Sequence, residues 1–288
     1  MNKGKKFGWG FIELIFAAVI VMDAFMAPIY AEAKTKTSKA AKTSASAVTA
    51  VKQSIAGKNV SILGDSISTY VYYNPANYGF YYSPDTDVDN VNKTWWVQAI
   101  SMCGANICSN ASCSGTPVCG MSDDPLGRAG CSTQRVLNLT SSAGVKPDVV
   151  LVYMGMNDLN KNIPLGNNMG LTPVAEGAVV YFSDAYSLML DKIRAYYPSA
   201  QIYCITFNNR CLIDQEPVSS YVNSIGLKSE DYNNRIKAIA ANKGAQVIDV
   251  FNNSGITRKT AKLYTYDGMH PNAAGSSLVA ACVRSYFQ

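Results

Sequence analysis

The only histidine of this 288-residue chain, His270, lies three residues after an aspartate, Asp267. In a turn, this spacing lets the carboxylate accept a hydrogen bond from the imidazole. An imidazole oriented by a carboxylate is the base that a serine nucleophile requires. Because a lone histidine is more often an ordinary core or surface residue, the pair becomes a candidate catalytic base only if a nucleophile lies within reach.

Ser66 is the candidate nucleophile. It follows the largely apolar run 60–63 and the dipeptide Gly64-Asp65, where a buried strand would end in a sharp corner. In open α/β sheets, ligands bind at the carboxyl ends of the strands. We therefore expect Ser66 to lie at the ligand-binding edge of a sheet.

Two further residues have the chemistry to stabilise an oxyanion. Asn157 follows the apolar run 148–154, and its side-chain amide is a hydrogen-bond donor. Gly115 lies in a loop, and a substrate can approach its backbone N–H closely because glycine has no side chain. Taken alone, each of these residues is more commonly a turn residue.

Strands and helices that alternate along the chain must position these residues. The pattern predicts strands that begin near 60, 107, 148, 201 and 246, and helices over 92–103, 132–139, 174–197, 230–242 and 272–286. This alternation indicates a parallel sheet that is covered by helices on both faces.

The composition indicates a globular enzyme or binding protein rather than a nucleic-acid-binding protein. Hydrophobic residues make up 48% of the chain and charged residues 16%. Residues 1–53 carry eight lysines against three acidic residues, which accounts for the whole net charge of +5. The rest of the chain carries 17 basic and 17 acidic residues, so it lacks the basic surface that nucleic-acid binding needs.

The N-terminal segment has the pattern of an export signal. A basic start precedes an apolar run over 7–27, and Ala31-Glu32-Ala33 fits a cleavage site. Glu13 and Asp23 interrupt the run, which disfavours a membrane span, although an uncleaved anchor is the alternative. We expect a secreted or cell-surface protein with no stable membrane partner after cleavage.

Three regions follow from this reading of the chain. They are a signal peptide over 1–33, a flexible linker rich in Lys, Thr, Ser and Ala over 34–56, and one catalytic domain over 57–288. Eight cysteines fit an exported protein. We expect them to be small buried residues with one or two disulfide bonds among them, and the sequence assigns no pair. No two are spaced C-x-x-C, which disfavours a zinc ribbon.

An aromatic loop follows Ser66. Residues 70–82 hold six tyrosines and one phenylalanine, and Asn, Pro and Gly interrupt them. One interpretation is an aromatic platform for a sugar or an aryl group, with Tyr70, Tyr72 and Tyr73 as candidate substrate-binding residues. The other is a loop that its own rings pin to the body of the protein.

These residues together resemble the SGNH, or GDSL-like, hydrolase family. Gly64-Asp65-Ser66-Ile67 is similar to the first family block, and Gly115 is similar to the glycine of the second. Residues 155–158 match Gly-x-Asn-Asp, and residues 267–270 match Asp-x-x-His. All four blocks occur in the family's order between residues 64 and 270.

The resemblance implies a fold, a site and a reaction. The fold is a three-layer α/β/α sandwich with a mainly parallel central sheet, of the flavodoxin-like kind. The site is a triad of Ser66, His270 and Asp267, with an oxyanion hole formed by the backbone amides of Ser66 and Gly115 and the side chain of Asn157. The resemblance implies no metal and no cofactor.

We therefore expect a secreted serine esterase that hydrolyses short-chain acyl esters through an acyl-enzyme. The export signal and the aromatic loop favour O-acetyl groups on carbohydrate, in a small-molecule or polysaccharide ester. An O-acyltransferase acting on cell-wall or exopolysaccharide with the same triad is the first alternative. A long-chain lipase is the second, and a non-catalytic binding module is disfavoured by the complete catalytic set.

Overall fold

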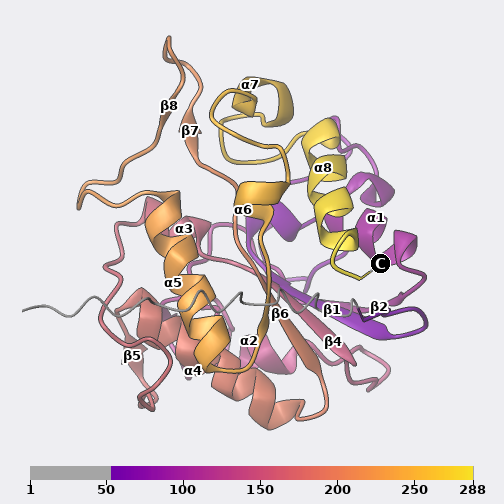
Figure 1. Cartoon of the computed structure of the whole chain (residues 1–288). Coiled ribbons are helices and arrows are strands. Elements are labelled where there is room, and N and C mark those ends of the chain that lie inside the picture. The colour runs from indigo at the N-terminus through magenta and orange to yellow at the C-terminus, as the bar shows by residue number, and fades with distance from the viewer. Residues whose placement is uncertain (1–52, 288) are drawn as a thin grey trace, which may run out of the picture. The chain divides into compact units, whose positions relative to one another are not determined.

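The computed structural model describes residues 53–287, so the predicted signal peptide and most of the predicted linker lie outside the described residues. A five-stranded sheet in which every neighbouring pair is parallel forms the middle layer (Figure 1). Its strands in spatial order are β2 (Asn106–Asn110), β1 (Asn59–Gly64), β4 (Val149–Tyr153), β6 (Gln201–Ile205) and β9 (Gln246–Ile248). The predicted fold class, a flavodoxin-like α/β/α sandwich, is confirmed.

Helices cover both faces of this sheet. On one face α1 (Trp95–Met102) packs against α8 (Ala273–Arg284); on the other, α4 (Phe182–Tyr196) packs against α2 (Thr133–Leu137) and α5 (Ser229–Asn242) (Figure 1). All five residues of β4 are buried, and so are five of the six in β1. A strand that is covered on both faces needs apolar residues along its whole length rather than an alternating pattern, which explains the continuous apolar runs in the sequence.

The order of the strands reverses between β1 and β4. The chain leaves β1 toward β2 on one side, and later continues from β4 toward β6 on the other. The two strands pair in register up to Gly64 and Tyr153, so their carboxyl ends lie side by side. Such a reversal opens a crevice at the carboxyl edge of a parallel sheet.

The helix that the sequence predicts over 174–197 is shorter, since α4 begins only at Phe182. Instead, β5 (Ala178–Val179) pairs antiparallel with β3 (Gly120–Met121). Gly177 adopts a φ of 118°, and its backbone exchanges hydrogen bonds with Ser122. This left-handed glycine and the tertiary pairing override the apolar spacing that suggested a helix.

Several short elements were not predicted from the sequence. They are α3 (Met156–Asn160), the hairpin of β7 (Cys211–Leu212) and β8 (Ser219–Ser220), α6 (Val250–Asn253) and α7 (Ala261–Tyr264). The base of the hairpin supports the histidine loop, because the Cys211 N–H donates to the carbonyl of Gly268 over 2.9 Å. Elements this short have no periodicity of their own, and contacts from distant parts of the chain define them.

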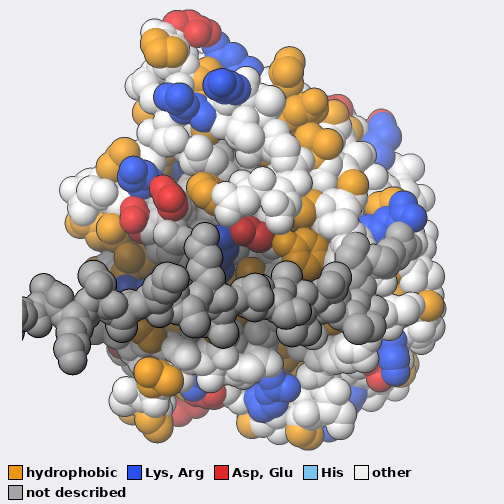
Figure 2. Space-filling view, in the orientation of Figure 1, with side chains coloured by type: hydrophobic (Ala, Val, Ile, Leu, Met, Phe, Trp, Pro, Cys, Tyr) orange, Lys and Arg blue, Asp and Glu red, His pale blue; other side chains and the backbone are white. Residues whose placement is uncertain are grey.

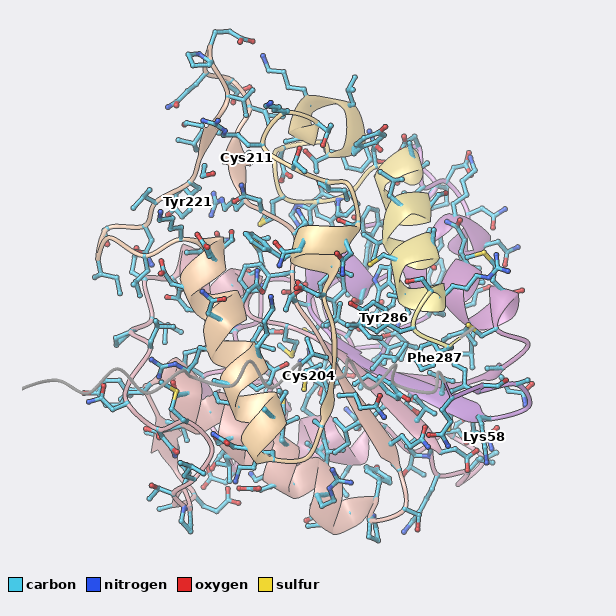
Figure 3. The ribbon with its side chains drawn as sticks, in the orientation of Figure 1. Lys58, Cys204, Cys211, Tyr221, Tyr286 and Phe287 are labelled. Atoms are coloured by element: carbon cyan, nitrogen blue, oxygen red, sulfur yellow. The ribbon has the colours of Figure 1, made fainter. Side chains whose placement is uncertain are left out.

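The expectation of one or two disulfide bonds is wrong. All eight cysteines lie in the described part of the chain and are unpaired, and seven of them are buried. Figure 3 shows two of them well separated, with Cys204 on the central sheet and Cys211 in the hairpin. The cysteines therefore serve as small core residues, which was the other half of the expectation.

Within residues 53–287, no helix combines the length and the apolar character needed to cross a bilayer. On the uncovered part of the face in Figure 2, basic side chains stand singly or in small groups, and acidic side chains are interspersed among them.

Candidate active site

The corner after β1 is shaped by its neighbours in sequence. The single-turn helix η1 (Ser66–Ser68) follows directly, and the Asp65 carboxylate caps it by accepting a hydrogen bond from the Ile67 N–H over 3.1 Å. A Cβ atom on Gly64 would lie 2.6 Å from the Cβ of Ser68 and 2.7 Å from the Oγ of Ser112. Glycine is therefore required for space, and the chain presents Ser66 at the end of β1.

A buried arginine stabilises this corner through hydrogen bonds. The guanidinium of Arg135 is fully buried, and its Nη2 donates to the carbonyl of Gly64 over 2.6 Å and to the hydroxyl of Thr116 over 3.2 Å. Thr116 follows Gly115, so Arg135 ties the nucleophile corner to the loop of the second family block. Burial raises the pKa of Asp65 to about 6, although the Ile67 N–H and the charges of His270 and Arg135 act in the opposite direction.

The histidine loop, residues 265–271, is held together by hydrogen bonds between its own residues. Thr265 and Pro271 form a short antiparallel bridge at its two ends. One carboxylate oxygen of Asp267 accepts hydrogen bonds from the backbone N–H groups of Met269 (3.0 Å) and His270 (2.8 Å). The loop therefore fixes the aspartate and the histidine relative to each other before any contact with the rest of the site.

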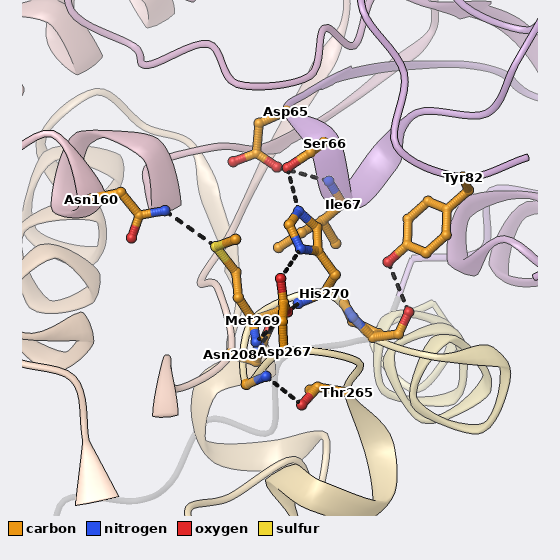
Figure 4. Close-up of polar contacts among 12 residues, drawn as sticks. Asp65, Ser66, Ile67, Tyr82, Asn160, Asn208, Thr265, Asp267, Met269 and His270 are labelled. Atoms are coloured by element: carbon orange, nitrogen blue, oxygen red, sulfur yellow. Dashed lines mark hydrogen bonds and ion pairs between the residues drawn. The ribbon is translucent and has the colours of Figure 1, made fainter. Parts of the chain in front are cut away.

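A continuous chain of hydrogen bonds joins the three residues predicted as a triad (Figure 4). The second carboxylate oxygen of Asp267 lies 2.7 Å from Nδ1 of His270, and Nε2 of His270 lies 2.9 Å from the Oγ of Ser66. Ser66 and His270 are 204 positions apart in the sequence. The fold thus brings these side chains together in the order that a nucleophile, a base and an orienting carboxylate require.

The carboxylate of Asp267 is held in its charged form. Burial alone would raise its pKa, but the hydrogen bond and charge of His270, together with the backbone N–H groups of His270 and Met269, lower the pKa below its ordinary value. An ionised Asp267 can stabilise the imidazolium that forms when His270 accepts a proton.

Asn157 lies on α3, immediately after β4, and is only 8% exposed. Its amide nitrogen, Nδ2, is buried and has no hydrogen-bond partner among the described residues. A buried donor without a partner costs about 1–3 kcal/mol, so this amide is a candidate to donate to a bound substrate. Because β4 neighbours β1, this free donor lies at the same edge of the sheet as Ser66.

Gly115 lies in the loop that continues from β2 past the end of β1. The Cys113 N–H donates to the carbonyl of Gly64 over 3.2 Å, which keeps this loop beside the nucleophile corner. Gly115 is exposed and adopts a φ of +72°, a left-handed conformation that favours glycine. The structure therefore places Gly115 at the same edge of the sheet as Ser66, and Gly115 is exposed to solvent there.

Asp158, next to Asn157, connects these two parts of the site. Its carboxylate accepts hydrogen bonds from the backbone N–H groups of Val118 (2.8 Å) and Cys119 (3.1 Å). It thereby fastens the loop after Gly115 to α3. Burial raises the pKa of Asp158 to about 7 in spite of these bonds. The Gly-x-Asn-Asp pattern contains this residue, but its partners cannot be read from the sequence.

The raised pKa of Asp158 predicts a pH-dependent stability. The folded protein keeps a proton on this carboxyl that the unfolded chain releases near 3.8, so the free energy of unfolding should fall as the pH rises from about 4 to about 7. The fall should be on the order of a few kcal/mol, and Asp65 contributes with the same sign. Asp158→Asn should flatten this slope in urea unfolding measured across that pH range. The exposed Asp85→Asn is the control, and an unchanged slope in Asp158→Asn would contradict the assignment.

A tyrosine that the sequence did not single out lies on the histidine. The ring of Tyr81 stacks on the imidazole of His270, with the ring centroids 3.6 Å apart and the planes 10° from parallel. The Tyr81 N–H donates to the hydroxyl of Thr69 over 2.8 Å, and the neighbouring Tyr82 hydroxyl donates to the carbonyl of Pro271 over 2.8 Å. The signal was present in the aromatic loop, but nothing in the sequence distinguishes Tyr81 from the other rings.

The structure does not bring the three predicted substrate-binding tyrosines to Ser66. Tyr70 is buried, and its hydroxyl donates to the carbonyl of Asp89 over 2.7 Å. Tyr72 and Tyr73 are exposed and line a different cavity, which Ser66 does not line. The aromatic loop is thus pinned to the body of the protein by some of its rings, while Tyr72 and Tyr73 stay exposed.

The stack on His270 leads to a prediction for Tyr81. Tyr81→Leu should lower kcat/KM about 3- to 30-fold, because the stacked ring face holds the imidazole in its orientation toward Ser66. Tyr81→Phe should stay within about twofold of the wild type, since it keeps the ring. Steady-state hydrolysis of p-nitrophenyl acetate measures both variants. If Phe is as damaging as Leu, the hydroxyl rather than the stacked ring is responsible and the assignment is wrong.

A cavity of about 670 Å³ opens next to Gly115. Its walls include Gly115 and Thr116 on one side and Lys161, which directly follows α3, on another. This volume lies within the range of small-molecule sites, which is roughly 300–1,000 Å³. Ser66, His270 and Asn157 are not among its lining residues, so the cavity adjoins the Gly115 side of the candidate site and does not enclose the nucleophile.

Comparisons with known proteins agree with this geometry. A family model described as GDSL-like Lipase/Acylhydrolase matches residues 58–246. The chain is also similar to the crystal structure of a GDSL-like lipase from Bacteroides uniformis, with 27% identity, a TM-score of 0.58, and coverage of 80% of this chain and 94% of that one. No curated protein matches the chain.

Two further solved structures share the fold at lower identity. One is a GDSL-like lipase from Bacteroides ovatus, with 24% identity, a TM-score of 0.57, and coverage of 80% of this chain and 98% of that one. The other is a protein from Lactobacillus plantarum, with 18% identity, a TM-score of 0.59, and coverage of 81% and 97%. At these identities the likeness concerns the fold alone.

Proposed function

The chain belongs to the family of GDSL-like lipases and acylhydrolases, as the four sequence blocks predicted. From this premise we propose that it is a secreted serine esterase with Ser66 as its nucleophile. The observation that carries the proposal is the chain of hydrogen bonds from Asp267 through His270 to Ser66. The unpaired amide of Asn157 at the same sheet edge supports it.

The first half of the proposed reaction forms an acyl-enzyme. His270 Nε2 accepts the proton of the Ser66 hydroxyl while Oγ attacks the ester carbonyl carbon. The carbonyl oxygen becomes an oxyanion, which accepts hydrogen bonds from Asn157 Nδ2 and from the backbone N–H groups of Ser66 and Gly115. Collapse of this intermediate breaks the bond to the alcohol, which leaves with the proton from His270.

The second half releases the acid. A water molecule gives a proton to His270 and attacks the acyl carbon, and the same donors hold the second oxyanion. The bond to Ser66 Oγ then breaks, His270 returns its proton to Oγ, and the carboxylic acid leaves. Asp267 stays ionised throughout, because its pKa is held below the ordinary value.

The proposed substrate is a short-chain ester on carbohydrate, with an O-acetyl group as the simplest case. The N-terminal export pattern supports a substrate outside the cell. The cavity beside Gly115 contains both cationic and anionic side chains, so it suits a polar alcohol better than a long alkyl chain.

Release of acetate tests this function. The full chain should free acetate from acetylated xylan or acetylated pectin, and should hydrolyse p-nitrophenyl acetate faster than p-nitrophenyl palmitate. Preference for the palmitate would favour a lipase. Faster transfer than hydrolysis in the presence of an acceptor sugar would favour an acyltransferase, and no activity on any short acyl ester would contradict the proposal.

A further inference from the structure

We propose that a second cavity, along the open edge of the central sheet, binds a neutral saccharide chain outside the catalytic centre. The cavity has a volume of about 800 Å³ and lies beside β2, which pairs only with β1 in the sheet. Ser66, Asn157 and His270 are not among its lining residues. The class of ligand, a saccharide, rests on the proposed function.

The chemistry of the walls suits an uncharged sugar. Among the described residues that line the cavity, none carries a charge. The walls combine aromatic rings and small neutral polar groups with aliphatic side chains; the aromatic and polar ones include Tyr72, Tyr73, Trp96, Asn110, Asn138 and Thr140. A sugar ring offers apolar C–H faces to aromatic rings and hydroxyl groups to amides, whereas an anionic ligand would find no counter-charge here.

Two tyrosines present their rings to solvent at the mouth of this cavity. Tyr72 is 93% exposed and has a φ of 69°, a left-handed conformation that is uncommon for an aromatic residue. Tyr73 is 52% exposed and rests edge-on against Tyr70, with the ring centroids 5.9 Å apart. Tyr70 is itself anchored by its hydrogen bond to Asp89, so it braces the platform rather than contacting a ligand. Strained, exposed rings of this kind commonly mark a binding site.

The aromatic loop leads from this cavity toward the catalytic centre. A smaller cavity of about 360 Å³ shares Tyr72, Asn74 and Pro75 with the first, and it extends to Phe80. Phe80 precedes Tyr81, whose ring lies on His270. The loop thus places binding surface between the sheet edge and the histidine, which suits an extended chain better than a monosaccharide.

Binding to the inactive full-length protein tests the proposal without hydrolysis. Isothermal titration of Ser66→Ala with xylohexaose and cellohexaose should show binding of at least one, and hexagalacturonate should bind more weakly because it is anionic. Tyr72→Asn removes the ring while keeping a residue that tolerates positive φ. This change, and separately Tyr73→Ala, should weaken binding about tenfold. Tyr196→Ala, which removes an exposed ring on α4 that does not line the cavity, is the matched control and should leave the affinity unchanged.

Each outcome decides between the two claims. Failure of both neutral hexasaccharides to bind, tighter binding of hexagalacturonate, or equal loss in the Tyr196 variant would overturn the saccharide site. If the hexasaccharides bind as expected but the wild type frees no acetate, the saccharide site stands and the proposed function fails. If acetate is released but no hexasaccharide binds, the proposed function stands and the saccharide site fails.

Discussion

Replacing Ser66 by alanine should lower kcat for p-nitrophenyl acetate by about four to six orders of magnitude. The variant loses the proposed nucleophilic atom, the Ser66 Oγ that lies 2.9 Å from Nε2 of His270. The proposed oxyanion donors would remain, so a small residual rate above water is expected.

The Ser66→Ala variant should remain folded, because among the described residues the Ser66 Oγ is hydrogen-bonded to His270 alone. Its melting temperature should therefore stay close to that of the wild type, which separates loss of chemistry from loss of structure. A variant that folds and keeps more than a tenth of the wild-type rate would show that another group is the nucleophile.

Replacing Asn157 by alanine should lower kcat about 10²- to 10³-fold and change KM little. The Nδ2 of Asn157 has no hydrogen-bond partner among the described residues, so we expect it to donate its strongest hydrogen bond when negative charge develops on a substrate oxygen. An interaction that exists only in the transition state affects kcat rather than KM.

Asn160→Ala is the matched control for this second variant. Asn160 lies on the same short helix, but its amide already donates to the sulfur of Met269 over 3.2 Å. The two variants should differ by at least tenfold in kcat when both are measured at saturating substrate. An equal effect would mean that α3 matters only for structure, and that Asn157 is not an oxyanion donor.

The fold could be predicted from the sequence because its main signals are local. A buried parallel strand needs a continuous apolar run, and the alternation of such runs with helices leaves few possible architectures. The juxtaposition of Ser66 and Asn157 also follows, since β1 and β4 are parallel and their carboxyl ends meet at one edge. The family and the fold are therefore confirmed, while the catalytic roles of individual residues stay predictions.

Other features could not be predicted, because they depend on contacts between distant segments. Nothing in the sequence distinguishes Tyr81, which lies on His270, from Tyr70, which is buried as a brace. The carboxylate of Asp158 is hydrogen-bonded to Val118 and Cys119, which lie 40 and 39 positions away in the sequence. The start of α4 at Phe182 is set by the pairing of β5 with β3. Strands of two residues leave no recognisable pattern in the sequence, so this pairing could not be predicted.

Covalent labelling tests the central claim, that Ser66 is an activated nucleophile, most directly. The folded full-length protein would be treated with a fluorophosphonate probe, digested, and analysed by mass spectrometry. The account predicts one modified residue, Ser66, and loss of labelling after His270→Ala, because the hydroxyl then lacks its base. Active protein that is not labelled, or that is labelled at a different residue, would contradict it.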